Sequence, residues 1–156
     1  MILPIVAYGD PVLKRMADEI EEDYPELDKL IADMFETMEG AQGVGLAAPQ
    51  IGKSIRLFIV DGSPFAEDED LEEEEREVLK DFRKVFINPI ILEEAGEPWD
   101  FQEGCLSIPG IREDVKRPEE LVIEYYDESW VLKEETCFGI PARIIQHDYD
   151  HIEGVL

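Results

Sequence analysis

The hydrophobic positions between Tyr24 and Gly40 recur at intervals of three and four residues. This spacing places them on one face of an α-helix and predicts an amphipathic helix in the N-terminal part of the chain. Pro25 suits the first turn of such a helix, and Gly40 suits its end. The predicted apolar face consists of Leu27, Leu30, Ile31, Met34, Phe35 and Met38.

β-Branched and aromatic residues are concentrated in four runs in the middle of the chain. IRLFIV (55–60) and KVFINPIIL (84–92) have the composition of strands. ELVIEYYD (120–127) and WVLKEETCF (130–138) are separated by a short polar connection, which predicts a hairpin. The middle of the chain is therefore expected to form antiparallel strands.

A second helical pattern runs from Pro141 to Gly154, where apolar residues and both histidines of the chain share adjoining faces. Pro141 suits the first turn of this helix, and Gly154 suits its end. Two helices on either side of antiparallel strands predict the α+β class. A length of 156 residues is enough for a single domain (1–156) with a hydrophobic core.

The segment between the first two predicted strands, about residues 62–83, is dominated by acidic side chains. Residues 67–77 are almost wholly acidic, which favours solvation or disorder at the start of the segment. The pattern favours a surface insertion whose helix packs on the body and is dispensable for chemistry, and a docking element is the alternative. The apolar stripe of the predicted helix consists of Leu71, Val78, Leu79 and Phe82.

The acidic excess extends over the whole chain, with 39 Asp and Glu residues against 14 Lys and Arg residues and a net charge of −25. Such a surface repels nucleic acid and anionic membranes. The chain has no run of about 18 apolar residues, so no membrane-spanning helix is expected, and MILPIVAYGD does not have the pattern of a signal peptide. Cys105 and Cys137 are expected to be free thiols in a reducing cytoplasm.

The stretch IIQHDYDHIEG (144–154) contains the only two histidines of the chain, His147 and His151. On a helix, a spacing of four residues directs both imidazoles to one side, where they can share a metal ion. Asp148 directly follows the first histidine, as the general base does in H-E-x-x-H metal sites. Two histidines that merely belong to a packed helix face are the alternative, and the adjacent carboxylate favours the metal site.

Cys105, in the stretch FQEGCLSIPGI (101–111), is the candidate third ligand. A zincin protease would take its third ligand downstream, but Glu153 lies on the wrong helix face. One thiolate and two imidazoles would leave an open position for water, as in catalytic metal sites. A small buried hydrophobic residue is the alternative role for Cys105. Cys137, within a strand-like run, is expected to have that buried role.

A glycine-rich stretch, GVGLAAPQIG (43–52), lies between the first predicted helix and the first predicted strand. It lacks the third glycine and the lysine of phosphate-binding loops. Its informative residue is Gln50, because a neutral amide donor suits an oxyanion without competing for a metal. An amide that only caps the loop is the alternative.

Taken together, these stretches resemble the three signature motifs of the peptide deformylase family: GVGLAAPQ (43–50), EGCLS (103–107) and QHDYDH (146–151). LPIVAYGDPVL (3–13) is similar to the start of the family, so the likeness covers nearly the whole chain. The resemblance implies antiparallel β-sheets packed around a C-terminal metal-binding helix. It also implies removal of the formyl group from the N-terminal formyl-methionine of nascent polypeptides, with release of formate. The chain departs from the family in Asp148, where the family has a catalytic glutamate, and in its unusually acidic insertion.

The resemblance also implies roles for the residues of the site. Asp148 would transfer the proton, while Gln50 and the backbone N–H of Leu106 would stabilise the oxyanion. The metal would be one divalent ion, Fe(II) in the cell, with Zn, Ni or Co possible in a purified sample. Its implied ligands are Cys105, His147 and His151.

The same likeness implies a substrate cleft and a supporting interaction. Glu103 would support the site by pairing with a base, either Arg112 or Arg117. An extended peptide would lie beside the GVGL backbone like an added strand. The residues implied to line or flank the cleft are Val44, Gly45, Ile140 and Ile144.

The implied partners are N-formylmethionyl nascent peptides, with transient proximity to the ribosome. No nucleic-acid or membrane contact is expected, and the protein is expected to be a monomer in the cytoplasm. Three rival functions are the alternatives. A zincin-type peptidase would need the missing downstream ligand, and an acidic interaction module rests on charge alone. A catalytically weak or silent relative that binds metal and formylated peptide ends is suggested by Asp148.

Overall fold

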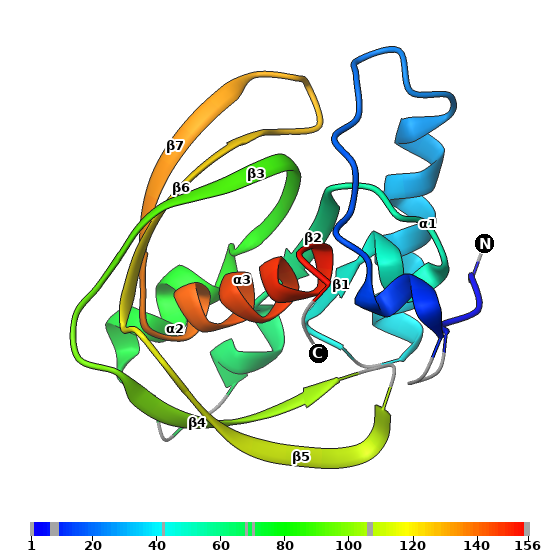
Figure 1. The fold of residues 1–156 in the computed structure, drawn as a ribbon. Coiled ribbons are helices and arrows are strands. Elements are labelled where there is room, and N and C mark those ends of the chain that lie inside the picture. The colour runs from blue at the N-terminus through cyan, green and yellow to red at the C-terminus, as the bar shows by residue number, and fades with distance from the viewer. Residues whose placement is uncertain are drawn as a thin grey trace.

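The structure of the chain is a computed structural model, drawn in Figure 1. It describes residues 2–6, 10–41, 43–67, 69, 71–105 and 108–154, with the backbone alone described for 100–105 and 108–116. Across these residues, no helix combines the length and the apolar character needed to cross a membrane.

In the described residues, seven strands and three α-helices make up the fold, together with short 3-10 helices. The strands are β1 (Gly45–Ala47), β2 (Leu57–Asp61), β3 (Arg83–Ala95), β4 (Trp99–Cys105), β5 (Ile108–Arg117), β6 (Glu120–Tyr126) and β7 (Leu132–Phe138). The helices are η1 (Pro11–Lys14), α1 (Leu27–Gly40), η2 (Ala48–Ile51), η3 (Ser63–Glu67), α2 (Glu73–Lys80) and α3 (Gly139–Ile152). Five strands form an antiparallel sheet in the order β1-β2-β3-β6-β7, and β4 pairs with β5 in a separate hairpin. The α+β prediction is confirmed.

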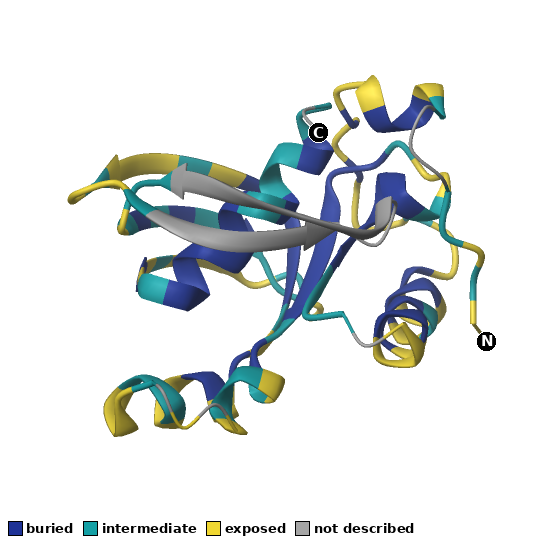
Figure 2. Cartoon of the chain, turned by 90° about the horizontal axis from the view of Figure 1, so that it is seen from below, coloured by how far each residue is buried: buried dark blue, intermediate teal, exposed yellow. Residues whose placement is uncertain are grey.

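Helices cover both faces of the five-stranded sheet. Leu57 and Ile59 of β2 pack in a cluster with α1, whereas Phe58 and Val60 pack in a second cluster with α3. Successive side chains of β2 thus point to opposite faces of the sheet, as the two-residue period of a strand requires. It explains why β2 is a continuous apolar run: neither of its faces meets water. Figure 2 shows the middle of the sheet in dark blue, as buried residues.

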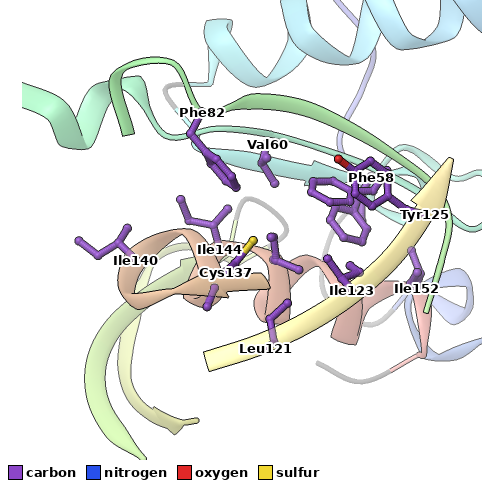
Figure 3. Packing of buried hydrophobic residues seen from close by; sticks show 14 of the residues in the cluster. Phe58, Val60, Phe82, Leu121, Ile123, Tyr125, Cys137, Ile140, Ile144 and Ile152 are labelled. Carbon is purple, nitrogen blue, oxygen red and sulfur yellow. The ribbon is translucent and has the colours of Figure 1, made fainter. Parts of the chain in front are cut away.

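The cluster on the α3 side forms the core under the candidate site. Phe86 stacks on Phe58 with ring centroids 4.8 Å apart, and the ring centroids of Phe86 and Tyr125 are 4.3 Å apart. Ile144 and Ile152 of α3 face these strands, as Figure 3 shows. Burial of these apolar side chains holds α3 against the sheet.

The first predicted helix is confirmed, because all six residues of its apolar face are buried on α1. Its start differs from the expectation: Glu26 is the N-cap residue, so Pro25 lies before the helix and not in its first turn. The predicted hairpin corresponds to the antiparallel pair β6 and β7. Gly154 follows the C-cap of α3 with φ +81°, a left-handed conformation that suits glycine at this position.

The acidic segment between β2 and β3 forms η3 and α2. Leu79 is fully buried and Phe82 is 5% exposed, so the predicted stripe packs on the body, but Val78 points to solvent and is 57% exposed. The guanidinium of Arg76 donates from Nε to the carbonyl oxygen of Ala66 at 2.8 Å, which ties α2 to η3. The boundary of the insertion, about 62–83, stays a prediction.

Candidate metal centre

His147 and His151 lie one turn apart on α3, with ring centroids 5.0 Å apart and ring planes inclined by 75°. Two imidazoles that share an ion tetrahedrally, with metal–nitrogen bonds of about 2.0–2.1 Å, hold their ring centres at about this separation. His151 is only 3% exposed. This separation is compatible with a shared metal ion, and the assignment of the two histidines as ligands stays a prediction.

Asp148 brings the first and third sequence motifs into contact. Its side chain is 1% exposed, and its carboxylate lies against Gly45 of β1. A Cβ placed on Gly45 would lie 2.1 Å from Oδ2 of Asp148, which is well inside van der Waals contact. The glycine therefore provides the space that the carboxylate occupies.

Gly45→Ala is expected to lower kcat/KM by about 100-fold, since the new methyl group would displace the Asp148 carboxylate by an ångström or more. Metal content should not change, because the three atoms nearest to the new methyl group all belong to Asp148 and none to a histidine. Steady-state kinetics with a formylated peptide and metal analysis would test this expectation. Gly40→Ala is the control, because a Cβ there lies 3.4 Å from its nearest neighbour. Wild-type kinetics in Gly45→Ala would show that the contact is unimportant.

Gln50 occupies a buried position at the end of the glycine-rich motif and is 2% exposed. Its side-chain oxygen accepts a hydrogen bond from the backbone N–H of Ala47 at 3.0 Å. The loop-capping role is therefore present in the structure. It does not conflict with the predicted role, because the cap uses the amide oxygen and an oxyanion would be bound by the amide nitrogen.

The second motif lies mainly outside the described residues. β4 ends at Cys105, but the side chains of Glu103, Cys105 and Arg112 are not described, and Leu106 lies outside the described residues altogether. Within the described part of the chain, no group of three His, Cys, Asp or Glu residues could hold a metal. The assignment of Cys105 as third ligand stays a prediction.

Three side chains of α3 tie the helix to the base of the β4–β5 hairpin. Asp150 pairs with Arg117 at 2.7 Å, and Nε2 of Gln146 donates to the carbonyl oxygen of Pro118 at 3.1 Å. Arg143 donates to the carbonyl oxygen of Trp99 and stacks over its ring. Because β4 leads from this base to Cys105, these contacts connect the strand that carries the cysteine to the helix that carries the histidines.

The sequence alone predicts no role for these three residues, Arg143, Gln146 and Asp150. Gln146 and Asp150 flank the histidines in QHDYDH, so their place in the motif was a signal for a role at the site. Arg117 was expected to be one of two possible partners of Glu103, and in the structure it pairs with Asp150. The pairing of Glu103 with Arg112 or Arg117 stays a prediction.

The apolar residues predicted for the substrate cleft belong to one hydrophobic cluster. Ile140 and Ile144 are 2% and 5% exposed, and Val44 packs against the same cluster while partly buried. Cys137 is a free thiol in this cluster. Burial raises the pKa of its thiol to about 11, so it remains protonated at neutral pH, in keeping with the buried role expected for it.

Known proteins resemble this chain over its whole length. The sequence model of the family described as polypeptide deformylase matches residues 2–156. The chain belongs to this family. A curated peptide deformylase of Christiangramia forsetii is 61% identical over 156 residues, covering 100% of this chain and 80% of the relative.

Solved deformylase structures share the fold. The peptide deformylase of Thermotoga maritima superposes with a TM-score of 0.84 at 35% identity, covering 100% of this chain and 95% of that one. A deformylase from Acinetobacter baumannii bound to Met-Ala-Ser has a TM-score of 0.85 at 33% identity, with coverage of 100% and 96%. The protein is thus a metal-dependent hydrolase that removes the formyl group from the N-terminal formyl-methionine of nascent polypeptides. The alternative of a silent relative is not favoured, because the curated relatives are deformylases.

Proposed function

We propose that deformylation in this protein takes place at one divalent ion held by Cys105, His147 and His151, with Asp148 as the group that transfers the proton. The observation that carries this proposal is the position of the Asp148 carboxylate, which is buried on the histidine helix and lies against Gly45. A buried carboxylate on the same helix as two neighbouring imidazoles suits metal-assisted hydrolysis.

The donor set fits a catalytic metal. A soft thiolate and two imidazoles suit Fe(II), Zn, Ni or Co, and we infer Fe(II) as the ion used in the cell. When bound, such an ion lowers the pKa of a water molecule and so supplies a nucleophile at neutral pH. Three protein ligands of this kind would leave room for that water on the ion.

Side chains and backbone groups around the proposed metal site carry out proton transfer and stabilise the oxyanion. Asp148 accepts the proton of the attacking water and later delivers it to the departing amine of methionine. The Nε2 group of Gln50 and the backbone N–H of Leu106 donate to the oxygen of the formyl group as it becomes negatively charged. Burial of Asp148 and Gln50 strengthens these interactions, because water does not screen them.

The peptide is proposed to bind beside β1, the edge strand of the five-stranded sheet. The Met-Ala-Ser complex of the Acinetobacter deformylase supports a peptide ligand of this kind. Val44, Ile140 and Ile144 would surround the methionine side chain, in agreement with their membership of one hydrophobic cluster.

Gln50→Glu is expected to lower kcat by about 10²–10³-fold, the usual effect of losing one oxyanion donor. The glutamate keeps an oxygen that can accept from the backbone N–H of Ala47, so the loop should keep its conformation. It replaces the donating nitrogen with a second oxygen, which repels the oxyanion. Gln50→Ala should also destabilise the loop, so a comparison of thermal unfolding separates the two roles. A Gln50→Glu enzyme with wild-type kcat would exclude the oxyanion role.

A formate-release assay tests the function as a whole. The metal-loaded protein should release formate from formyl-Met-Ala-Ser and should leave the peptide bonds of an N-acetylated peptide intact. Cleavage of those bonds would indicate a zincin-type peptidase instead. Metal binding without formate release would indicate a silent relative.

We further propose that the protein acts in the cytoplasm as a monomer, on chains that have just left the ribosome. The net charge of −25 argues against direct binding to ribosomal RNA, so contact with the ribosome would be transient. The proposed role of Glu103 is to support Cys105 through Arg112 or Arg117. Analytical ultracentrifugation would test the oligomeric state.

A further inference from the structure

The N-terminal end of α3 receives no cap from its own N-cap residue. Phe138 occupies this position and makes no capping hydrogen bond through its side chain. The first N–H of the helix, from Gly139, donates to the carbonyl oxygen of Glu119 at 3.0 Å. The next N–H, from Ile140, donates to Oε1 of Glu75 at 3.2 Å. A carboxylate from the acidic segment therefore satisfies the start of the helix that carries both histidines.

The carboxylate of Glu75 also packs closely against the backbone. Gly139 has φ +60°, and a Cβ placed on it would lie 2.7 Å from Oε1 of Glu75. The glycine thus permits both the backbone conformation and the approach of the carboxylate. The partial positive charge at the start of a helix favours an anion at this place.

The acidic segment holds Glu75 firmly in this position. Leu79, one turn further along α2, is fully buried in the cluster that contains Ile140 and Ile144. Arg76 anchors the same helix to η3 through Ala66. Figure 1 shows α2 beside the first turns of α3, in agreement with the hydrogen bond between Ile140 and Glu75, and Figure 3 shows Ile140 and Ile144 on α3. These contacts argue against a dispensable insertion.

A different residue secures the other end of α3. The guanidinium of Arg56 lies 3.5 Å from the carbonyl oxygen of Ile152 and 3.3 Å from the carboxylate of Glu153. The histidine end of the helix is therefore held independently of Glu75. His147 lies about 10 Å along the helix from Ile140, at a rise of about 1.5 Å per residue. Loss of Glu75 should thus disturb Ile140 more than the metal ligands.

We propose that Glu75 is a positioning residue that fixes the first turn of α3 and, through Ile140, determines how well the methionine side chain fits. This inference rests on the proposed function, which places Ile140 in the methionine pocket. Its effect is expected on substrate binding and side-chain selectivity. The proton-transfer step and the metal content should be unaffected, because Asp148 and the histidines lie further along the helix.

The experiment compares Glu75 variants with a neighbour on the same helix. Glu75→Ala removes the acceptor, and Glu75→Asp keeps the charge but withdraws the oxygen. Both should raise KM for formyl-Met-Ala-Ser by about threefold or more, with kcat within about twofold of wild type. Both should also lower the preference for formyl-Met over formyl-Ala peptides. Glu75→Gln keeps an accepting oxygen and should restore most of the wild-type KM and selectivity, although it lacks the favourable charge. Glu74→Ala, which removes an exposed carboxylate next to Glu75, is the matched control.

Equal KM values and selectivity in Glu75→Ala, Glu75→Asp and Glu74→Ala would overturn the inference. A fall in kcat or in metal content at unchanged KM would also overturn it, as would a Glu75→Gln variant that behaves like Glu75→Ala. If Glu75→Ala does not unfold cooperatively, the KM and selectivity of Glu75→Asp decide the test, because this variant keeps the negative charge on α2. A wild-type protein that released no formate would contradict the proposed function instead, so the two failures are distinguishable.

Discussion

The Cys105→Ser variant should lose its bound metal and, with it, formate release. A serine hydroxyl is not ionised at neutral pH and is a much weaker ligand for a soft or borderline ion than a thiolate. Loss of a supporting residue around a metal typically costs about 10–100-fold in affinity or activity, so loss of a ligand itself should cost more than that. Metal analysis of the purified variant and the formate assay would measure both effects.

Cys137→Ser is the matched control for this experiment. Cys137 is buried in the hydrophobic cluster and its thiol has a pKa of about 11, so it is not a candidate ligand at neutral pH. The control should keep wild-type metal content. If metal survives in Cys105→Ser but is lost in Cys137→Ser, the proposed ligand set is wrong.

Asp148→Asn should retain the metal but lose about 10²–10⁴-fold in kcat, which is the usual size of the acid–base contribution. Asparagine has nearly the same shape as aspartate, so it should fit the space against Gly45, but it cannot accept the proton. Asp28→Asn, at an exposed position of α1, is the control for a change of charge alone. Unchanged kcat in a metal-loaded Asp148→Asn enzyme would place the proton-transfer group elsewhere.

The Asp148→Glu variant tests the effect of having aspartate at the position where the family has its catalytic glutamate. The aspartate is shorter by one methylene, which withdraws the carboxylate by roughly 1–1.5 Å, and a displacement of that size can cost about 100-fold. We expect glutamate to raise kcat at least about tenfold, because it restores the reach of the family's catalytic residue. An equal or lower kcat would mean that the contact between residue 148 and Gly45 has adapted the cleft to aspartate.

Local patterns in the sequence were sufficient for the main elements of the fold. The three- and four-residue spacing predicted α1, because a helix face depends only on residues that are close in sequence. The same reasoning placed His147 and His151 on one side of α3, where their rings are 5.0 Å apart. The resemblance to the deformylase family could also be found from the sequence, because each of the three motifs is a continuous stretch of residues.

Local sequence patterns did not predict the burial of both faces of β2 or the role of the acidic segment. A short apolar run fits a buried strand or a piece of helix equally well until the layers on both faces are known. Val78 fitted the predicted apolar stripe and yet lies in solvent, because α2 presents Leu79 to the core instead. The acidic composition suggested a solvated insertion, and it did not indicate that one carboxylate caps α3.

The sequence by itself thus determined the fold class, the family and the histidine pair, since all of these depend on residue type and short-range spacing. Only the tertiary structure decided which distant residues meet: Asp148 with Gly45, and Glu75 with Ile140. Both contacts join segments far apart in the chain, and their existence depends on how the layers pack around the sheet. Local propensity carries no information about such packing, which follows from burying apolar surface over the whole domain.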